Sequence, residues 1–87
     1  MMAFLLIRTY PGSEGAVMSR VKELPEVVEV AETMGGWNLF LKLNIGAKED
    51  MGRFVKNHVN GKDIMETRSL FCVVNGKSVK TSFTDGD

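Results

Sequence analysis

The sequence predicts an α+β protein with a ferredoxin-like βαββαβ sandwich, in which two helices cover one face of a four-stranded antiparallel sheet. Two observations support this fold class. Four stretches with strand character alternate with two stretches whose apolar residues recur at helical spacing, in the order β-α-β-β-α-β. Right-handed crossovers in both βαβ units then interlock the strands into one sheet with both helices on the same side.

The first half of the chain contains a strand, a helix and a second strand. Residues 3–10, AFLLIRTY, have strand character and end at PGS, where Ser13 is the predicted N-cap of the helix. Within residues 14–24 the apolar side chains recur at helical spacing, and Pro25 ends that helix. Residues 27–33, VVEVAET, are rich in β-branched side chains and alternate, so they form the second strand.

The second half contains a strand, a helix and a last strand. Residues 38–45, NLFLKLNI, alternate like a strand, and residues 47–59, AKEDMGRFVKNHV, return to helical spacing. Residues 64–75, IMETRSLFCVVN, form the last strong strand. We assign the domain to residues 1–74 and treat residues 75–87 as a polar C-terminal tail, which has the length to add a short edge strand.

Composition limits what the domain does. The chain has 87 residues, the size of one small domain, with 44% hydrophobic and 25% charged residues, which argues against disorder. Lys and Arg total 11 and balance 11 Asp and Glu, so the basic excess typical of nucleic-acid binding is missing and we expect no direct contact with DNA. The apolar N-terminal run is too short for a membrane span or a signal peptide, so we expect a cytoplasmic protein.

Gly35 and Gly36 are predicted to form a two-residue hairpin turn, because glycine tolerates the positive φ that such turns need at both positions. In that register Glu29 faces Lys42, so opposite charges meet across the strands. The same register sorts apolar residues onto the helix-covered face. The predicted core residues of these two strands are Val28, Val30, Leu39, Leu41 and Leu43.

The opposite face of the sheet has no helix to cover it. Phe4 and Leu6 of the first strand and Phe40 of the third would leave there an apolar patch larger than monomers usually expose. A second copy packing face to face would bury this patch, so we predict a homodimer through this face. The alternative is that the C-terminal tail folds back over it.

Signatures of catalysis and of metal binding are missing from the sequence, so we predict no enzyme activity, no cofactor and no metal. Cys72 is the only cysteine, and in an apolar run cysteine usually behaves as a small buried hydrophobic residue. His58 is the only histidine, and we expect it on the surface near the end of the second helix.

One edge of the predicted sheet gathers polar and aromatic groups. The interlocked topology brings residues 8–10, 34–38 and 64–68 together beside the N-terminus of the first helix. Backbone N–H groups and a helix N-terminus suit a carboxylate, and the side-chain oxygen of Asn38 is a suitable acceptor for an ammonium group. This combination suits a small zwitterion.

Three groups of residues in a fixed order carry a resemblance to a known family: Pro11-Gly12 after the first strand, Leu24-Pro25 followed by Val27 and Val30, and Gly35-Gly36-Trp37-Asn38-Leu39. Over roughly residues 3–74, the chain resembles the effector domain of the Lrp/AsnC (leucine-responsive/asparagine) transcriptional regulators, called the RAM domain. It departs from the family pattern at Met34, where threonine is usual, and at Asn38, where aspartate is usual.

The resemblance implies a module that dimerises through its sheet face, assembles into larger rings and binds an amino acid near the hairpin loop where dimers meet. Carried over by position, the ligand-binding residues are Met34, Gly35, Gly36, Trp37 and Asn38, with Thr67, Arg68 and Ser69 nearby. Family regulators carry an N-terminal helix-turn-helix domain, whereas this chain begins at the effector domain. The resemblance therefore implies a stand-alone effector-sensing and oligomerisation module without its own DNA-binding domain.

Two other functions remain open at this point. Dimeric ferredoxin-like sandwiches also include small monooxygenases and isomerases, and in that alternative Arg8, Tyr10, Trp37 and His58 are the candidate residues. A buried cavity between sheet and helices with His58 pointing inward would favour it. The third interpretation is a structural partner that forms mixed oligomers with full-length Lrp/AsnC regulators and responds to no ligand.

Overall fold

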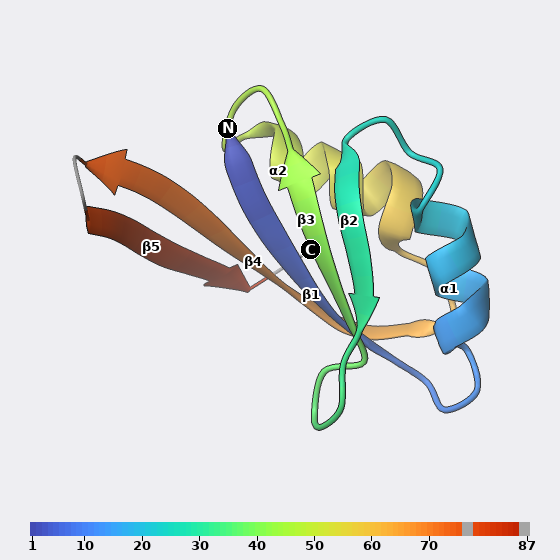
Figure 1. Cartoon of the computed structure of the whole chain (residues 1–87). Helices are drawn as coiled ribbons and strands as arrows, with labels where there is room; N and C mark the ends of the chain where they lie inside the picture. The colour runs from blue at the N-terminus through green and yellow to red at the C-terminus, as the bar shows by residue number, and fades with distance from the viewer. Residues whose placement is uncertain (76–77, 86–87) are drawn as a thin grey trace.

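The computed structural model describes residues 1–75 and 78–85, with side chains described through residue 72. Figure 1 shows the chain folded as one sheet with its helices gathered on one side. The elements in chain order are β1 (Met2–Thr9), α1 (Glu14–Val21), β2 (Val27–Glu32), β3 (Leu39–Asn44), α2 (Asp50–Phe54), the π-helical segment η1 (Val55–Val59), β4 (Ile64–Asn75) and β5 (Ser78–Asp85).

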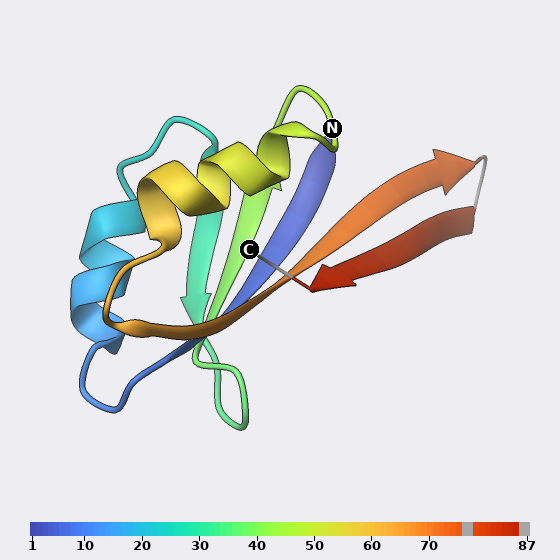
Figure 2. The same ribbon diagram turned by 180° about the vertical axis from the view of Figure 1, so that it is seen from behind.

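The strands form one antiparallel sheet in the order β2-β3-β1-β4-β5. Its first four strands, with α1 and α2 on a single face, give the predicted ferredoxin-like arrangement, which is confirmed (Figures 1 and 2). The fifth strand comes from the segment predicted as a polar tail. It pairs with the outer side of β4 and extends the sheet sideways, in contrast to the alternative in which the tail folds back over the open face.

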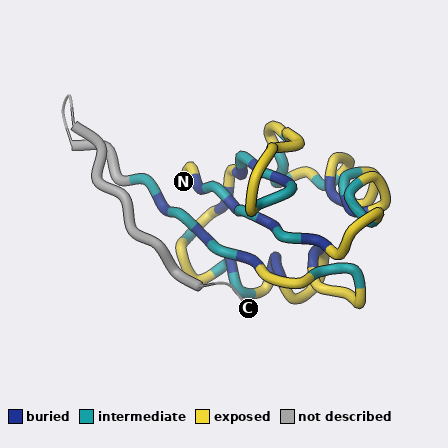
Figure 3. Tube along the Cα trace, turned by 90° about the horizontal axis from the view of Figure 1, so that it is seen from below, coloured by how far each residue is buried: buried dark blue, intermediate teal, exposed yellow. Residues whose placement is uncertain are grey.

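The core lies between the sheet and the helices. Burial alternates along β1 with a period of two, because successive strand side chains point to opposite faces, and Figure 3 shows this alternation along the trace. Side chains from α1, α2 and η1 pack on the inward-facing row of the sheet. The residues of this core with no exposed surface are Ala3, Leu5, Ile7, Val17, Val21, Leu39, Leu41, Leu43 and Val59.

The register between β2 and β3 agrees with the prediction at Glu29–Lys42, where opposite charges face each other. The prediction of Val28 as a core residue is wrong. A register shift between Val27 and Glu29 turns Val28 outward, so that it is 56% exposed, while Val27 packs against the core in its place. Such a β-bulge adds one residue to a strand, and it exchanges the faces of the residues beyond it.

The turn between β2 and β3 is longer than the predicted two-residue loop. It spans residues 33–38, and of the two glycines only Gly35 has a positive φ, +111°, so the prediction of positive φ at both was wrong. Thr33 and Asn38 face each other at the base of the loop, where the backbone N–H of Thr33 donates to the carbonyl of Asn38 at 2.9 Å. The wider loop preserves the register while it projects beyond the sheet (Figure 1).

Replacing Gly35 with alanine is expected to destabilise the fold by about 1–3 kcal/mol, because a side chain at φ +111° is strained whatever the space around it. Gly36→Ala is the matched control. Its added Cβ would lie 3.4 Å from Nη2 of Arg8, a flexible side chain, at a φ outside the left-handed region. Urea denaturation of both variants measures the difference, and equal losses of stability would contradict the assignment of strain to Gly35.

The helices are shorter and less regular than predicted. α1 begins after Ser13, as expected, but ends at Val21 rather than at residue 24. α2 passes into η1, whose last turn closes with a hydrogen bond of 2.9 Å from the backbone N–H of Asn60 to the carbonyl of Val55. This i→i+5 bond defines the π-helical geometry, which is rare and usually confined to a single turn.

An ion pair joins α1 to the connection that precedes β4. The guanidinium of Arg20 donates to both carboxylate oxygens of Asp63, at 2.9 and 3.0 Å, and to the carbonyl of Val59 at 2.9 Å. Hydrogen bonding to Arg20 lowers the pKa of the Asp63 carboxyl below its ordinary value. The bidentate pair therefore holds α1 and the end of η1 together.

Candidate functional site

The loop between β2 and β3 is anchored to the end of β1 by one residue. The backbone N–H of Asn38 donates to the carbonyl of Ile7 at 2.8 Å, and the side-chain oxygen of Asn38 accepts from the backbone N–H of Thr9 at 2.7 Å. Thr9 is only 3% exposed, so its N–H has little access to water. The side chain of Asn38 therefore supplies the acceptor for the N–H of Thr9, which lies where the register between β1 and β4 shifts.

Two arginines flank the indole of Trp37. The guanidinium carbon of Arg8 lies 4.8 Å from the centroid of the indole, and that of Arg68 lies 5.5 Å from it. Both distances are within the range of cation–π attraction. Arg8 also donates from Nε to the carbonyl of Gly36 at 2.7 Å, so the same side chain holds the loop and the ring.

Glu66 completes this group, which we call the Arg8–Trp37 cluster (Arg8, Gly36, Trp37, Glu66 and Arg68). Its carboxylate lies 3.3 Å from Nη1 of Arg8, the residue it faces across the β1–β4 pair. The side chains of Arg8 and Glu66 are 38% and 43% exposed, so the ion pair adds little to stability and remains accessible to solvent. The cluster thus brings two guanidinium groups and one carboxylate around the indole, and guanidinium groups are suited to binding an anionic group.

The structure brings part of the predicted ligand-binding set together. Gly36, Trp37 and Arg68 belong to the Arg8–Trp37 cluster, while Met34 is fully exposed at the loop and Gly35 forms the turn beside it. Thr67 and Ser69 are buried on the face that the helices cover, on either side of Arg68 in β4. The sequence-based set did not include Arg8 or Glu66. Both lie in the ranges 8–10 and 64–68 that the predicted topology brings to this edge, so the sequence placed them near the loop without assigning them to the ligand.

The four residues of the enzyme alternative do not form one site. Arg8 and Trp37 are in contact, but Tyr10 is exposed and His58 is exposed in η1, where its ring lies 5.6 Å from that of Phe54. Within the part of the chain that the structure describes, no group of three or more His, Cys, Asp or Glu is placed to hold a metal ion. No helix among the described residues is long and apolar enough to cross a membrane.

The open face of the sheet carries an apolar patch next to the cluster. The rings of Phe4 and Phe40 stack with centroids 5.0 Å apart. Leu6 of β1 faces Phe40 of β3 on one side and Arg68 of β4 on the other. Leu70 faces Phe4 and extends the patch onto β4. The side chains of this open-face patch (Phe4, Leu6, Phe40, Leu70 and Cys72) are half-buried in the single chain. Half-buried apolar side chains in a contiguous group are typical of a surface that binds a partner.

Comparison with known families gives one match over nearly the whole chain. Residues 2–83 match the family model of the Lrp/AsnC ligand binding domain. The HTH-type transcriptional regulator FL11 of Pyrococcus horikoshii is 33% identical over 55 residues, and FL11 of Pyrococcus furiosus is 33% identical over 54 residues. These alignments cover 63% and 62% of the chain, and the chain spans about a third, 36%, of the length of each curated relative.

Solved structures with the same fold cover most of both chains. The structure of TTHA0845 from Thermus thermophilus superimposes with a TM-score of 0.73 at 25% identity, covering 78% of this chain and 86% of that one. The hypothetical protein PHS023 from Pyrococcus horikoshii superimposes with a TM-score of 0.74 at 25% identity, covering 86% of this chain and 92% of that one. FFRP-DM1, at 24% identity and a TM-score of 0.69, shares the fold over 93% of this chain and 96% of its own chain.

Proposed function

The chain belongs to the Lrp/AsnC ligand binding domain family, and we propose that it senses a small amino acid-like effector and modulates transcriptional regulation by changing its state of assembly. The observation that carries the proposal is the Arg8–Trp37 cluster, which lies against the β2–β3 loop and borders the open-face patch. Regulators of transcription act where the DNA is, so we expect the protein in the cytoplasm.

The cluster offers complementary groups to an amino acid. A carboxylate would be attracted by the two guanidinium groups that flank Trp37, and the indole would pack against an apolar or aromatic side chain. Met34 and Gly35 belong to the same proposed site, because they form the loop that the cluster holds. Thr67 and Ser69 would support Arg68 from the buried face of β4.

Assembly is the second part of the proposal. A homodimer through the open-face patch would bury Phe4, Leu6 and Phe40, and the same surface would accept the corresponding domain of a full-length regulator. An effector that binds where subunits meet shifts the assembly only by its differential affinity for the two states. Because Leu6 faces Arg68 across the β1–β4 pair, a rearrangement of the cluster would alter the neighbouring dimer surface.

Thermal denaturation with each of the twenty amino acids and their 2-oxo acids tests the sensing function. An effector at 100 times its dissociation constant stabilises the folded state by about 2.7 kcal/mol, so we expect at least one compound to raise Tm by several degrees. Trp37→Ala should abolish that shift. Tyr10→Ala, which removes an exposed aromatic residue outside the cluster, should preserve it.

Light scattering with and without the same compound completes the test. We expect the effector to change the distribution of oligomers, because it would favour one assembly over another. A protein whose Tm and mass respond to none of these compounds would contradict the proposal. An equal response of wild type and Trp37→Ala would show that the effector binds outside the Arg8–Trp37 cluster.

A further inference from the structure

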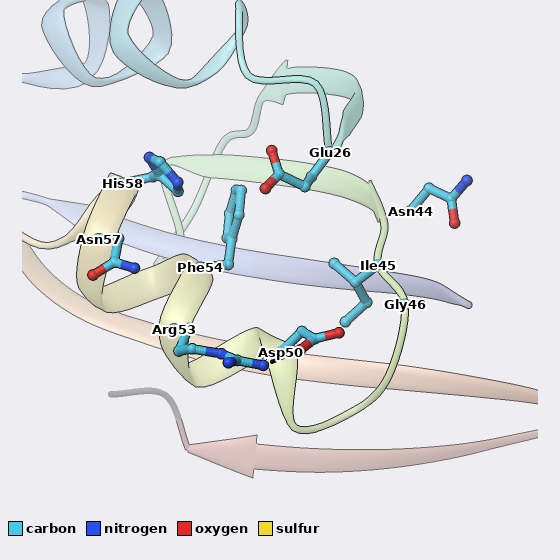
Figure 4. A pocket seen from close by; sticks show the side chains of 9 residues that line it. All are labelled: Glu26, Asn44, Ile45, Gly46, Asp50, Arg53, Phe54, Asn57 and His58. Carbon is cyan, nitrogen blue, oxygen red and sulfur yellow. Dashed lines mark hydrogen bonds and ion pairs between the residues drawn. The ribbon is translucent and has the colours of Figure 1, made fainter.

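A cleft of about 330 Å³ lies at the end of the sheet opposite the β2–β3 loop. It opens between the start of β2, the end of β3 and the helical segment α2–η1, and Figure 4 shows the side chains that line it. Its volume is at the lower end of the range of small-molecule pockets. The lining residues are Glu26, Asn44, Ile45, Gly46, Asp50, Arg53, Phe54, Asn57 and His58.

Glu26 holds an unpaired carboxylate oxygen inside this cleft. Its Oε1 is buried and has no hydrogen-bond partner among the described residues, the one such buried side-chain oxygen or nitrogen found there. The backbone of Glu26 is fixed, because its carbonyl accepts from the N–H of Asn44 at 2.8 Å. Leaving a buried acceptor unpaired is unfavourable, and more so when the group is charged, so this oxygen favours a donor from outside the chain.

The other ionisable groups of the cleft do not neutralise Glu26. Arg53, the only lining residue with a permanent positive charge, forms an ion pair with Asp50, and Asp50 also accepts from the backbone N–H of Ala47 at 2.9 Å. The N-terminal ammonium of Met1 also lies at the rim of the cleft, where it donates to the carbonyl of Ile45 at 2.7 Å and to Oδ1 of Asn44 at 3.3 Å. Neither this ammonium nor Arg53 pairs with Glu26, whose Oε1 remains an acceptor without a partner among the described residues.

An aromatic ring lies beside the carboxylate. Figure 4 shows the ring of Phe54 and the carboxylate of Glu26 projecting into the same space, with His58 on the far side of the ring. Phe54 is 4% exposed and belongs to the core, so its position does not depend on a ligand. A carboxylate and an aromatic ring around one space are the two groups that bind an ammonium ion together.

We propose that this cleft binds a small organic ammonium ion, a primary amine on a short apolar chain. The ammonium group donates to Oε1 of Glu26 and lies near Phe54, and the side-chain amide of Asn57 also lines the cleft. The cleft uses none of the residues of the Arg8–Trp37 cluster, so it is a second site beyond the proposed function and does not depend on it.

An NMR titration of the whole chain with n-butylammonium chloride tests the proposal. n-Butanol matches the probe in shape without the charge, and sodium butyrate reverses the charge. We expect saturable shifts of backbone amides at residues 44–46 and 53–58 for butylammonium, with no shifts at residues 33–38. Butanol should bind at least tenfold more weakly, and butyrate should not bind in the cleft.

Glu26→Gln removes the charge with little change of shape, and we expect it to weaken butylammonium binding at least tenfold. Glu29→Gln, which removes an exposed carboxylate from the adjoining strand β2, is the matched control and should bind like wild type. Equal affinities for butylammonium and butanol, an unchanged affinity in Glu26→Gln, or the absence of saturable shifts would each overturn the proposal. Because the shifts are read residue by residue, failure here leaves the test of the Arg8–Trp37 cluster unaffected.

Discussion

Replacing Leu6 with aspartate is expected to convert the proposed dimer to a monomer. Leu6 lies in β1, at the centre of the open-face patch, and faces Phe40 on one side and Arg68 on the other. Removing a leucine from an interface costs about 2 kcal/mol, and burying an unpaired carboxylate adds to this. In a twofold dimer the substitution occurs twice, so the dimer should weaken by about 4 kcal/mol, which is roughly 1,000-fold in its dissociation constant.

Light scattering measures the outcome directly, because one chain has a mass of 9.6 kDa and a dimer has twice that. Met65→Asp is the matched control, since Met65 is an apolar side chain, 50% exposed, near the start of β4 and away from the patch centre. We expect Met65→Asp to keep the mass of the wild type. A Leu6→Asp variant that is folded by circular dichroism and still dimeric would place the interface elsewhere.

Replacing Asn38 with alanine is expected to destabilise the fold by about 2 kcal/mol. The substitution leaves the buried N–H of Thr9 without the side-chain oxygen it donates to, and an unpaired buried donor costs about 1–3 kcal/mol. For a domain of this size, 1 kcal/mol lowers Tm by roughly 4–8 °C. We therefore expect a fall in Tm of about 8–16 °C, measured by thermal denaturation without ligand.

Asn38→Asp is the informative partner of this variant. A carboxylate keeps an oxygen in front of the N–H of Thr9, so we expect the stability of the wild type to be retained. It also restores the residue that is usual in the Lrp/AsnC pattern. If Asn38→Ala were as stable as wild type, or if Asn38→Asp lost as much stability as alanine, the anchoring role of the side-chain oxygen would be wrong.

These contacts change the interpretation of the loop. The sequence suggested the oxygen of Asn38 as an acceptor for a ligand's ammonium group, but the structure shows that it already accepts from the backbone of β1. The indole of Trp37 is half-buried beside two guanidinium groups. The cluster thus presents groups for a carboxylate and an apolar side chain more clearly than groups for an ammonium ion.

Much of the fold was predictable, because it depends on patterns local to each element. Alternation of apolar residues identifies β1 and β3, and the facing charges of Glu29 and Lys42 select the register of β2 against β3. The polar composition of residues 78–85 carried no clear strand signal, although they form β5. β5 lies at the edge of the sheet and is ordered by its pairing with β4. Pairing of this kind is not evident from amino-acid composition.

The order of the elements, the helix-covered core and the family resemblance can be read from residue types at fixed spacings along the chain. Which polar groups are paired depends on contacts between elements that are far apart in sequence. The contact of Asn38 with Thr9 joins residues 29 positions apart, and that of Arg8 with Gly36 joins residues 28 apart. The unpaired oxygen of Glu26 could not be predicted either. Hydrogen bonds form over about 3 Å in space, and sequence spacing does not specify distances of that kind between separate elements.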